Sequence, residues 1–193
     1  MSLYTDIVAG ITVWTNRPDL TAEMDIAIKQ ALRTAHKSGT FYRDLVVVNL
    51  TGQTVQQVQT IDLSANCPNY RQICYVKPAS LDIVYDPVDI RDLFDYDKVY
   101  KTNVYYGMGT SLILRAANPV DAIDICYHKM PTVNPIANID SWIADLHQEL
   151  IVLWAAATIL AFIGEQEVKT RVEALAKIAY QDLIEDATEL VRR

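Results

Sequence analysis

The chain has 193 residues, of which 51% are hydrophobic, and it carries 24 acidic against 17 basic residues, for a formal charge of −7. This composition excludes an intrinsically disordered chain, and the length suits one domain with an appendage or two small ones. The acidic balance, with no cluster of lysine or arginine, argues against a protein that grips DNA. We expect no measurable affinity for duplex DNA at physiological salt.

The N-terminal residues predict two helices. In the first, apolar residues recur at helical spacing until the "NRP" of residues 16–18 ends the run: Leu3, Ile7, Ile11 and Trp14. The second has Thr21 as its predicted N-cap and Gly39 as its C-terminal stop. His36 lies in its last turn, where a cation complements the helix dipole, and this accounts for it better than metal ligation does.

The middle of the chain changes to short β-branched or alternating runs, which predict antiparallel strands: "LVVVNL" (45–50), "QTVQQVQTIDL" (53–63) and "RQICYVKP" (71–78). Aspartates then fill "DIVYDPVDIRDLFDYDKVYK" (82–101). Their spacing is not that of an EF-hand loop, and the central glycine and closing glutamate are missing. We interpret this stretch as a solvated acidic face.

The glycines of "YYGMGTSLILRA" (105–116) raise the possibility of a phosphate-binding loop, which the pattern does not support. A dinucleotide loop needs a third glycine where Leu112 stands, and a Walker loop needs a GK[ST] ending. The run instead predicts a strand, with Leu112 and Leu114 on one face, that forms a hairpin with "AIDICYH" (122–128). Both glycines would let the chain turn into the hairpin.

Cys126 and His128 form the only close pair of histidine or cysteine residues, and two ligands do not make a tetrahedral zinc site. In a strand both would share the solvent side, and no signature around them supports a Cys–His nucleophile. The sequence singles out no pair of glycosidase carboxylates. The 3 cysteines lack a CxxC spacing, which indicates reduced thiols. We expect no catalytic residue, no cofactor and no metal.

The last third predicts a helical hairpin. The first helix is capped by Asn138 or Asp140 and runs to Gly164. Its apolar run, residues 150–163, is shorter than the roughly 18–20 residues of a membrane span, so we expect a buried helix and no membrane contact. The second helix begins with acids at Glu165 and ends in "ELVRR", which matches the helix dipole.

The predicted fold class is α+β, mainly α. Residues 1–40 and 134–193 would form a helical bundle, with residues 41–133 inserted as an antiparallel β lobe.

The order of three stretches resembles the head–tail adaptor (connector) proteins of tailed bacteriophages. The stretches are two short helices, a tyrosine-flanked glycine turn with its strands, and a Trp-led closing hairpin: "YTDIVAGITVWTNRPDLTAEMDIAIKQALRTAHKSGTFYRDL" (4–45), "YYGMGTSLILRAANPVDAIDICYHKMPTV" (105–133) and "IDSWIADLHQELIVLWAAATILAFIGEQEVKTRVEALAKIAYQDLIED" (139–186). The resemblance spans nearly the whole chain.

The resemblance implies a non-enzymatic structural protein of the virion neck, assembled in the host cytoplasm. Such adaptors form a homo-oligomeric ring, here expected as a dodecamer, beneath the portal protein. The ring extends the DNA channel and offers a platform for a tail or nozzle protein. DNA would pass transiently without specific binding, and the negative net charge suits this because like charges repel.

Many adaptors of this kind carry a long C-terminal extension that runs along the portal. This chain stops at "EDATELVRR" (185–193), so we expect its reach to be limited to the helix end. We therefore place the portal contact at the end of the last helix: Leu183, Ile184, Leu190, Val191, Arg192 and Arg193. The terminal arginines are explained equally well by the helix dipole. The candidates for a ring or tail interface lie around the glycine turn: Tyr100, Tyr105, Tyr106, Gly107 and Gly109. Tyrosines here fit ordinary strand composition as well as an interface.

Two alternatives to the adaptor role stay open at this stage. Another virion joining protein, of the tail-completion or tail-terminator type, would form a similar oligomer but bind on the tail side. A small intracellular enzyme with carboxylate or Cys126–His128 chemistry belongs to a different class altogether.

Overall fold

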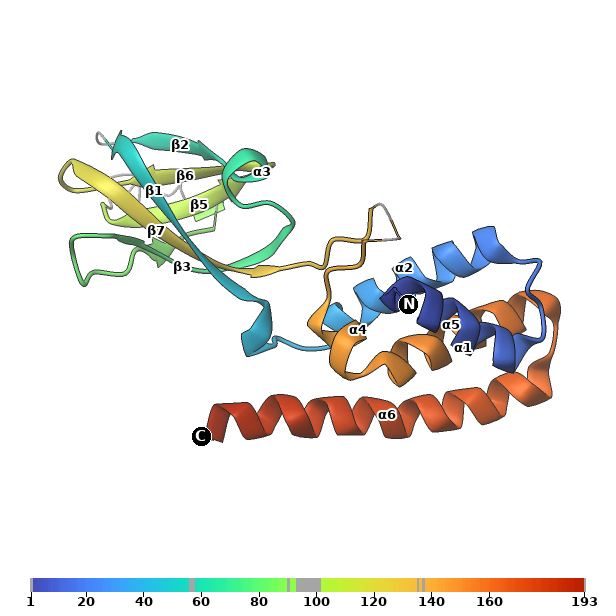
Figure 1. Cartoon of the computed structure of the whole chain (residues 1–193). Helices are drawn as coiled ribbons and strands as arrows, with labels where there is room; N and C mark the ends of the chain where they lie inside the picture. The colour runs from blue at the N-terminus through green and yellow to red at the C-terminus, as the bar shows by residue number, and fades with distance from the viewer. Residues whose placement is uncertain are drawn as a thin grey trace. The chain divides into compact units, whose positions relative to one another are not determined.

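The computed structural model describes residues 2–55, 58–89, 91–92, 102–134, 136 and 138–192. The chain forms two compact units, each with its own hydrophobic core (Figure 1): a helical unit, Met1–Arg43 with Pro131–Arg193, and a β unit, Asp44–Met130. The predicted fold class, α+β and mainly α, is confirmed. None of the described helices is long and apolar enough to cross a membrane.

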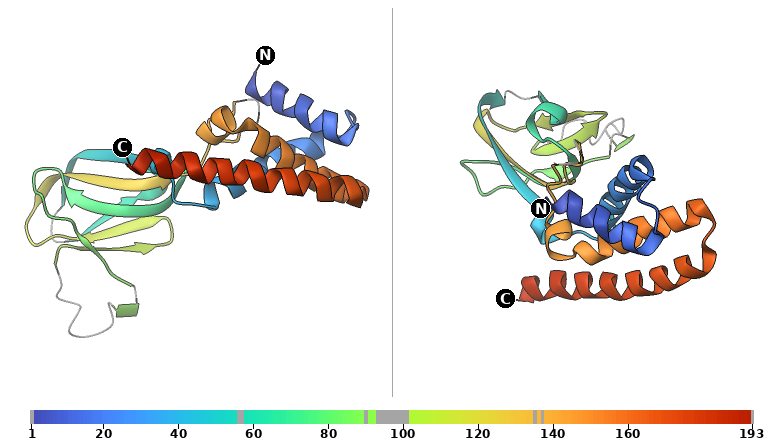
Figure 2. Two further views of the ribbon diagram at one scale, coloured as in Figure 1. Left: turned by 90° about the horizontal axis from the view of Figure 1, so that it is seen from below. Right: turned by 45° about the vertical axis from the view of Figure 1, so that its right-hand side comes forward.

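The helical unit is built around a central apolar helix. Its helices are α1 (Leu3–Thr15), α2 (Thr21–Lys37), α4 (Trp142–Leu146), α5 (Gln148–Ile163) and α6 (Gln166–Arg192). α1, α2 and α6 all pack against α5, which is why α5 is apolar on most of its circumference. α6 returns alongside α5 as the predicted hairpin (Figure 2), and one stripe of α6 is buried: Val172, Ala176 and Leu183.

α1 and α5 approach each other closely at Gly10. A Cβ atom at this position would lie 3.0 Å from both Cγ atoms of Val152. That distance is shorter than the 3.5–4.0 Å at which carbon atoms attract each other best, so any side chain here would push against α5. Ile7 and Ile11, on either side of Gly10, are fully buried in the core.

The ends of α2 differ from the sequence-based expectation. Thr21 is the first helical residue, and Leu20 occupies the N-cap without a side-chain hydrogen bond. At the other end Ser38 is the C-cap, in a right-handed conformation. Gly39 leaves room for the Phe41 ring: a Cβ atom at position 39 would lie 2.9 Å from that ring and clash with it.

Ser141 caps α4, so the prediction of Asn138 or Asp140 is wrong. The Ser141 hydroxyl accepts a hydrogen bond from the Ala144 N–H at 3.2 Å. The chain departs from helical geometry directly after α4 and then continues as α5, so the predicted single helix is two. The same hydroxyl lies 2.9 Å from Nε2 of His36, which lies in the last turn of α2 as predicted and is buried.

The β unit consists of two sheets. The first has the order β1-β7-β3, formed by Leu45–Val55, Val120–Lys129 and Tyr70–Pro78. The second has the order β2-β6-β5-β4, formed by Gln59–Asp62, Ser111–Arg115, Val104–Met108 and Asp86–Pro87. The turn η1 (Tyr42–Asp44) precedes β1, and α3 (Leu63–Asn66) follows β2. The run of residues 53–63, predicted as one strand, supplies parts of two strands in different sheets.

Both sheets contribute to one core. Leu112 and Leu114 share the buried face of β6, as predicted, and are fully buried. Residues of β1, β2, β3, β5 and β7 pack in the same cluster: Leu50, Ile61, Val76, Tyr105, Ile123, Ile125 and Tyr127. Ile113, on the opposite face of β6, is buried as well.

The predicted hairpin between "SLILR" and "AIDICYH" is wrong. β6 and β7 belong to different sheets, and β6 pairs antiparallel with β5, with Tyr106 opposite Ile113. Gly109 lies in the β5–β6 turn at φ +62°, whereas Gly107 lies inside β5 opposite Leu112. Only one of the two glycines is therefore required by the turn, and the proline-containing loop 116–119 leads from one sheet to the other.

Candidate interaction surfaces

Cys126 and His128 do not form a nucleophilic site. They share a face of β7, as predicted, but this strand lies between β1 and β3, and both side chains are buried, so the predicted solvent side is wrong. Burial raises the pKa of the Cys126 thiol, whereas a nucleophilic cysteine needs a lowered pKa. The described cysteines are free thiols, and no group of three or more His, Cys, Asp or Glu among the described residues could hold a metal ion.

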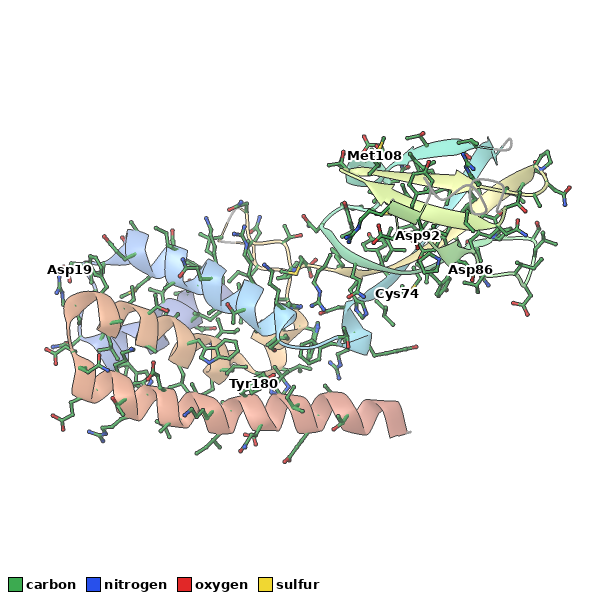
Figure 3. All side chains as sticks on the ribbon, turned by 180° about the vertical axis from the view of Figure 1, so that it is seen from behind. Asp19, Cys74, Asp86, Asp92, Met108 and Tyr180 are labelled. Atoms are coloured by element: carbon green, nitrogen blue, oxygen red, sulfur yellow. The ribbon has the colours of Figure 1, made fainter. Side chains whose placement is uncertain are left out.

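The residues of the glycine turn separate into core and surface. Tyr105 packs in the β-unit core, and burial raises the pKa of its phenol. Tyr106 is half-buried on the opposite face of β5. Gly107, Gly109 and the 53% exposed Met108 lie at the exposed tip of the hairpin, and Figure 3 labels Met108. Tyr100 lies outside the described residues.

The predicted portal contact falls on the C-terminal part of α6. Leu183 is fully buried in the helical core, and Ile184 is partly buried against it. Leu190, Val191 and Arg192 continue the helix, and their side chains lie outside the structural description. Arg193 lies outside the described residues. Of the six candidates, Leu183 therefore packs inside the chain's own core and is not exposed to a partner.

A segment of the β unit that we interpreted only as an acidic face also exposes apolar side chains. We call residues 81–89 the acidic loop. Leu81, Ile83 and Val84 are 46%, 48% and 56% exposed. Asp82, Asp86 and Asp89 between and after them are exposed too, and Figure 3 labels Asp86. This combination was missed because the aspartates dominate the sequence pattern.

The acidic loop is held by hydrogen bonds of its backbone. The N–H of Tyr85 donates to the Val76 carbonyl at 2.8 Å, and the N–H of Val88 donates to the Tyr105 carbonyl at 2.9 Å. The Tyr85 ring is buried in the β-unit core. The exposed apolar residues directly before Tyr85 are therefore anchored to the β unit through Tyr85.

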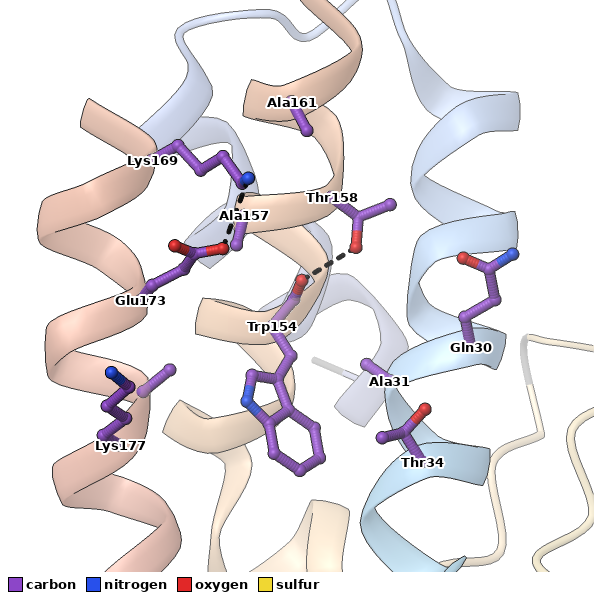
Figure 4. A pocket seen from close by; sticks show the side chains of 11 residues that line it. Gln30, Ala31, Thr34, Trp154, Ala157, Thr158, Ala161, Lys169, Glu173 and Lys177 are labelled. Atoms are coloured by element: carbon purple, nitrogen blue, oxygen red, sulfur yellow. Dashed lines mark hydrogen bonds and ion pairs between the residues drawn. The ribbon is translucent and has the colours of Figure 1, made fainter. Parts of the chain in front are cut away.

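A groove lies between α2 and α6, with α5 as its floor (Figure 4). We call it the helical groove; its volume is about 700 Å³. The floor and walls are formed largely by small side chains beside one indole: Ala31, Thr34, Ala157, Thr158, Ala161, Ala176 and Trp154. Sequence reasoning missed the groove, because the alanines read as ordinary residues of a buried helix.

The rim of the helical groove is mainly basic. Lys169 pairs with Glu173 at 3.4 Å, the ion pair drawn in Figure 4, and Lys177 lies one turn further along α6. On α2, Gln30 and Thr34 line the groove, and exposed Lys37 follows Thr34 by three residues, which places it on the same face.

The candidate interaction surfaces of the two units are therefore a groove, a loop and a hairpin tip. The sequence matches, over residues 2–193, the family described as SU10 adaptor protein, a family of phage head–tail adaptors. The chain belongs to this family, which confirms the resemblance seen in the sequence. No curated protein matches the chain at a significant level.

Membership of this family makes the chain a bacteriophage structural protein and a virion component that interacts with other phage structural proteins.

Proposed function

We propose that the protein is a head–tail adaptor that forms a ring beneath the portal, joins the capsid to the tail and extends the DNA channel. The observation that carries the proposal is that both units fold around separate cores and still expose large apolar side chains: Val13, Ile26 and Phe162 on the helical unit, and Val47, Leu81, Ile83, Val84 and Met108 on the β unit. A joining protein needs several contact surfaces, and exposed apolar groups are the usual material of such surfaces.

A ring requires heterologous contacts, in which one surface of a copy meets a different surface of the next. Two units with different surfaces meet this requirement. We propose that the ring is a dodecamer, the number of copies that the family resemblance implies. The formal charge of −7 suits a protein that lets DNA pass, because acidic surfaces repel phosphate.

For the portal contact we propose the end of α6 beyond Leu183. Leu183 fixes the helix in the core, and the residues that follow Ile184 continue it by further helical turns as far as Arg192. Deletion of residues 190–193 leaves Leu183 in place, so the helical unit should stay folded while portal binding is lost.

The test combines purified protein with portal particles and, separately, with tail tubes, followed by negative-stain microscopy. The proposal predicts a ring of density on the portal, and no ring from the chain that lacks residues 190–193. Tryptophan fluorescence verifies the fold of the shortened chain. Binding to tail tubes with no binding to portal particles would contradict the proposal in favour of a tail-completion or tail-terminator protein.

A further inference from the structure

We infer that the helical groove of one copy receives the acidic loop of the neighbouring copy in the ring. The inference rests on the proposed function, because ring formation supplies the neighbour. It identifies the occupant of the groove as a second copy of this chain, through a named segment.

The groove offers a floor for apolar side chains. Ala157 and Ala161 on α5 leave space between α2 and α6, and the half-buried indole of Trp154 closes one end. Small side chains on the floor allow a bound segment to approach the helix backbones. The volume of about 700 Å³ is within the range of pockets that enclose several side chains.

The acidic loop offers matching apolar groups. Leu81, Ile83 and Val84 are about half exposed, and the buried Tyr85 that follows prevents them from turning into the core of their own unit. Single exposed apolar residues are common on protein surfaces, but three within four positions form a patch that a partner can cover.

The charges of groove and loop are complementary. The groove is lined by Lys169, Lys177 and one acid, Glu173, and the exposed Lys37 lies one turn beyond Thr34 on α2. The loop carries Asp82, Asp86 and Asp89, and Nε of Arg91 lies 3.4 Å from an Asp89 oxygen. Opposite charges around an apolar contact fix its register and disfavour contacts between like surfaces.

The two surfaces differ from each other and belong to the same chain, as a ring contact requires. The groove belongs to the helical unit and the loop to the β unit, so every copy carries one of each. A contact between them is heterologous, and it can repeat from copy to copy until the ring closes.

Cysteine cross-linking between two populations of chains tests the inference. One population carries Ala161→Cys in the groove and the other carries Ile83→Cys in the loop; both also carry Cys74→Ser, which removes the exposed native thiol. A short bismaleimide is added to the mixture on portal particles and to the free proteins at high concentration. The inference predicts a cross-linked dimer in the portal-bound mixture.

Ala174→Cys is the matched control for the groove position, since Ala174 is exposed on α6 and does not line the groove. It should give no dimer with Ile83→Cys. Lys177→Glu should lower the dimer yield about fivefold, and Asp82→Lys with Asp86→Lys in the partner should restore it.

The outcomes separate this inference from the proposed function. A portal-bound ring without the Ala161–Ile83 cross-link overturns the groove–loop contact and leaves the adaptor role intact. A chain that carries both cysteines and cross-links only within itself overturns the contact between copies. If the protein binds no portal, the proposed function fails, and the free proteins decide the contact: a dimer supports it and its absence overturns it.

Discussion

Nε2 of His36 lies 2.9 Å from Oγ of Ser141, which joins the last turn of α2 to the cap of α4 across 105 positions in sequence. The Trp142 ring stands edge-on to the His36 ring, with centroids 6.1 Å apart. On another side of the indole, the guanidinium of Arg43 lies 5.3 Å from the ring centroid. A polar and aromatic cluster therefore fixes the entry of the C-terminal helices into the helical unit.

Ser141→Ala should destabilise the helical unit by about 2 kcal/mol. The substitution removes the cap of α4, worth about 1 kcal/mol, and a buried hydrogen bond to His36, worth a similar amount. Unfolding in urea, followed by tryptophan fluorescence, measures the effect, because Trp14, Trp142 and Trp154 all lie in the helical unit. Thr170→Ala, at an exposed position of α6 in the same unit, is the control, and equal stability of the two variants would refute the role of Ser141.

Gly10→Leu should destabilise the helical unit by about 2 kcal/mol, because a side chain at Gly10 overpacks against Val152. Ala9→Leu is the matched control on an exposed position of the same helix and should have little effect. Addition of Val152→Ala to the Gly10→Leu variant should recover part of the loss. Tryptophan fluorescence in urea measures all three, and a Gly10→Leu variant as stable as Ala9→Leu would show that α1 and α5 are not in close contact.

Gly109→Val should destabilise the β unit by about 2 kcal/mol, because a β-branched residue is strained at φ +62°. Gly107→Val provides the comparison: a Cβ atom there meets nothing within 4 Å, and the position lies in a strand. It should change stability by no more than about 0.5 kcal/mol. Methyl NMR signals of Ile123 and Ile125 in urea report on the β unit alone. Equal effects of both substitutions would contradict the observed turn.

The sequence predicts a turn near Gly107 and Gly109 but does not tell which of the two glycines the turn requires. The helices were predictable because apolar residues such as Ile7 and Ile11 recur with the period of a helix and become buried. The strands were also predictable, but their pairing was not. Alternation in "SLILR" and "AIDICYH" places each residue on a face and carries no information about which strand lies next to it.

The candidate surfaces were harder to predict than the fold. The helical groove is lined by small side chains from three helices, such as Ala31, Ala157 and Ala176, which come together only after α2, α5 and α6 pack. Likewise, nothing in the local sequence separates Tyr105, which packs in the core, from Tyr106, which does not. Such distinctions depend on tertiary packing.

Stability of the β unit should fall as the pH rises above about 10. Burial raises the pKa of Tyr85, Tyr105 and Tyr127 above the ordinary value of 10.0, so the folded state favours the protonated phenol. This contribution is fully present below the unfolded pKa and is lost as the pH rises through the folded pKa.

The urea midpoint of the Ile123 and Ile125 methyl signals, measured at several pH values, tests this prediction. Tyr127→Phe should reduce the slope of stability against pH above about pH 10, because it removes one of the groups that titrate. A midpoint that stays constant up to about pH 11 would contradict the burial of these phenols.

The central claim is that this chain joins the capsid to the tail. The most direct measurement uses phage particles produced without the protein, to which purified protein is then added in vitro. The account predicts that DNA-filled heads and free tails accumulate separately, and that the added protein first binds the heads and then restores joined, infectious particles. Joined particles in the complete absence of the protein, or restoration only when it is first bound to tails, would contradict the account.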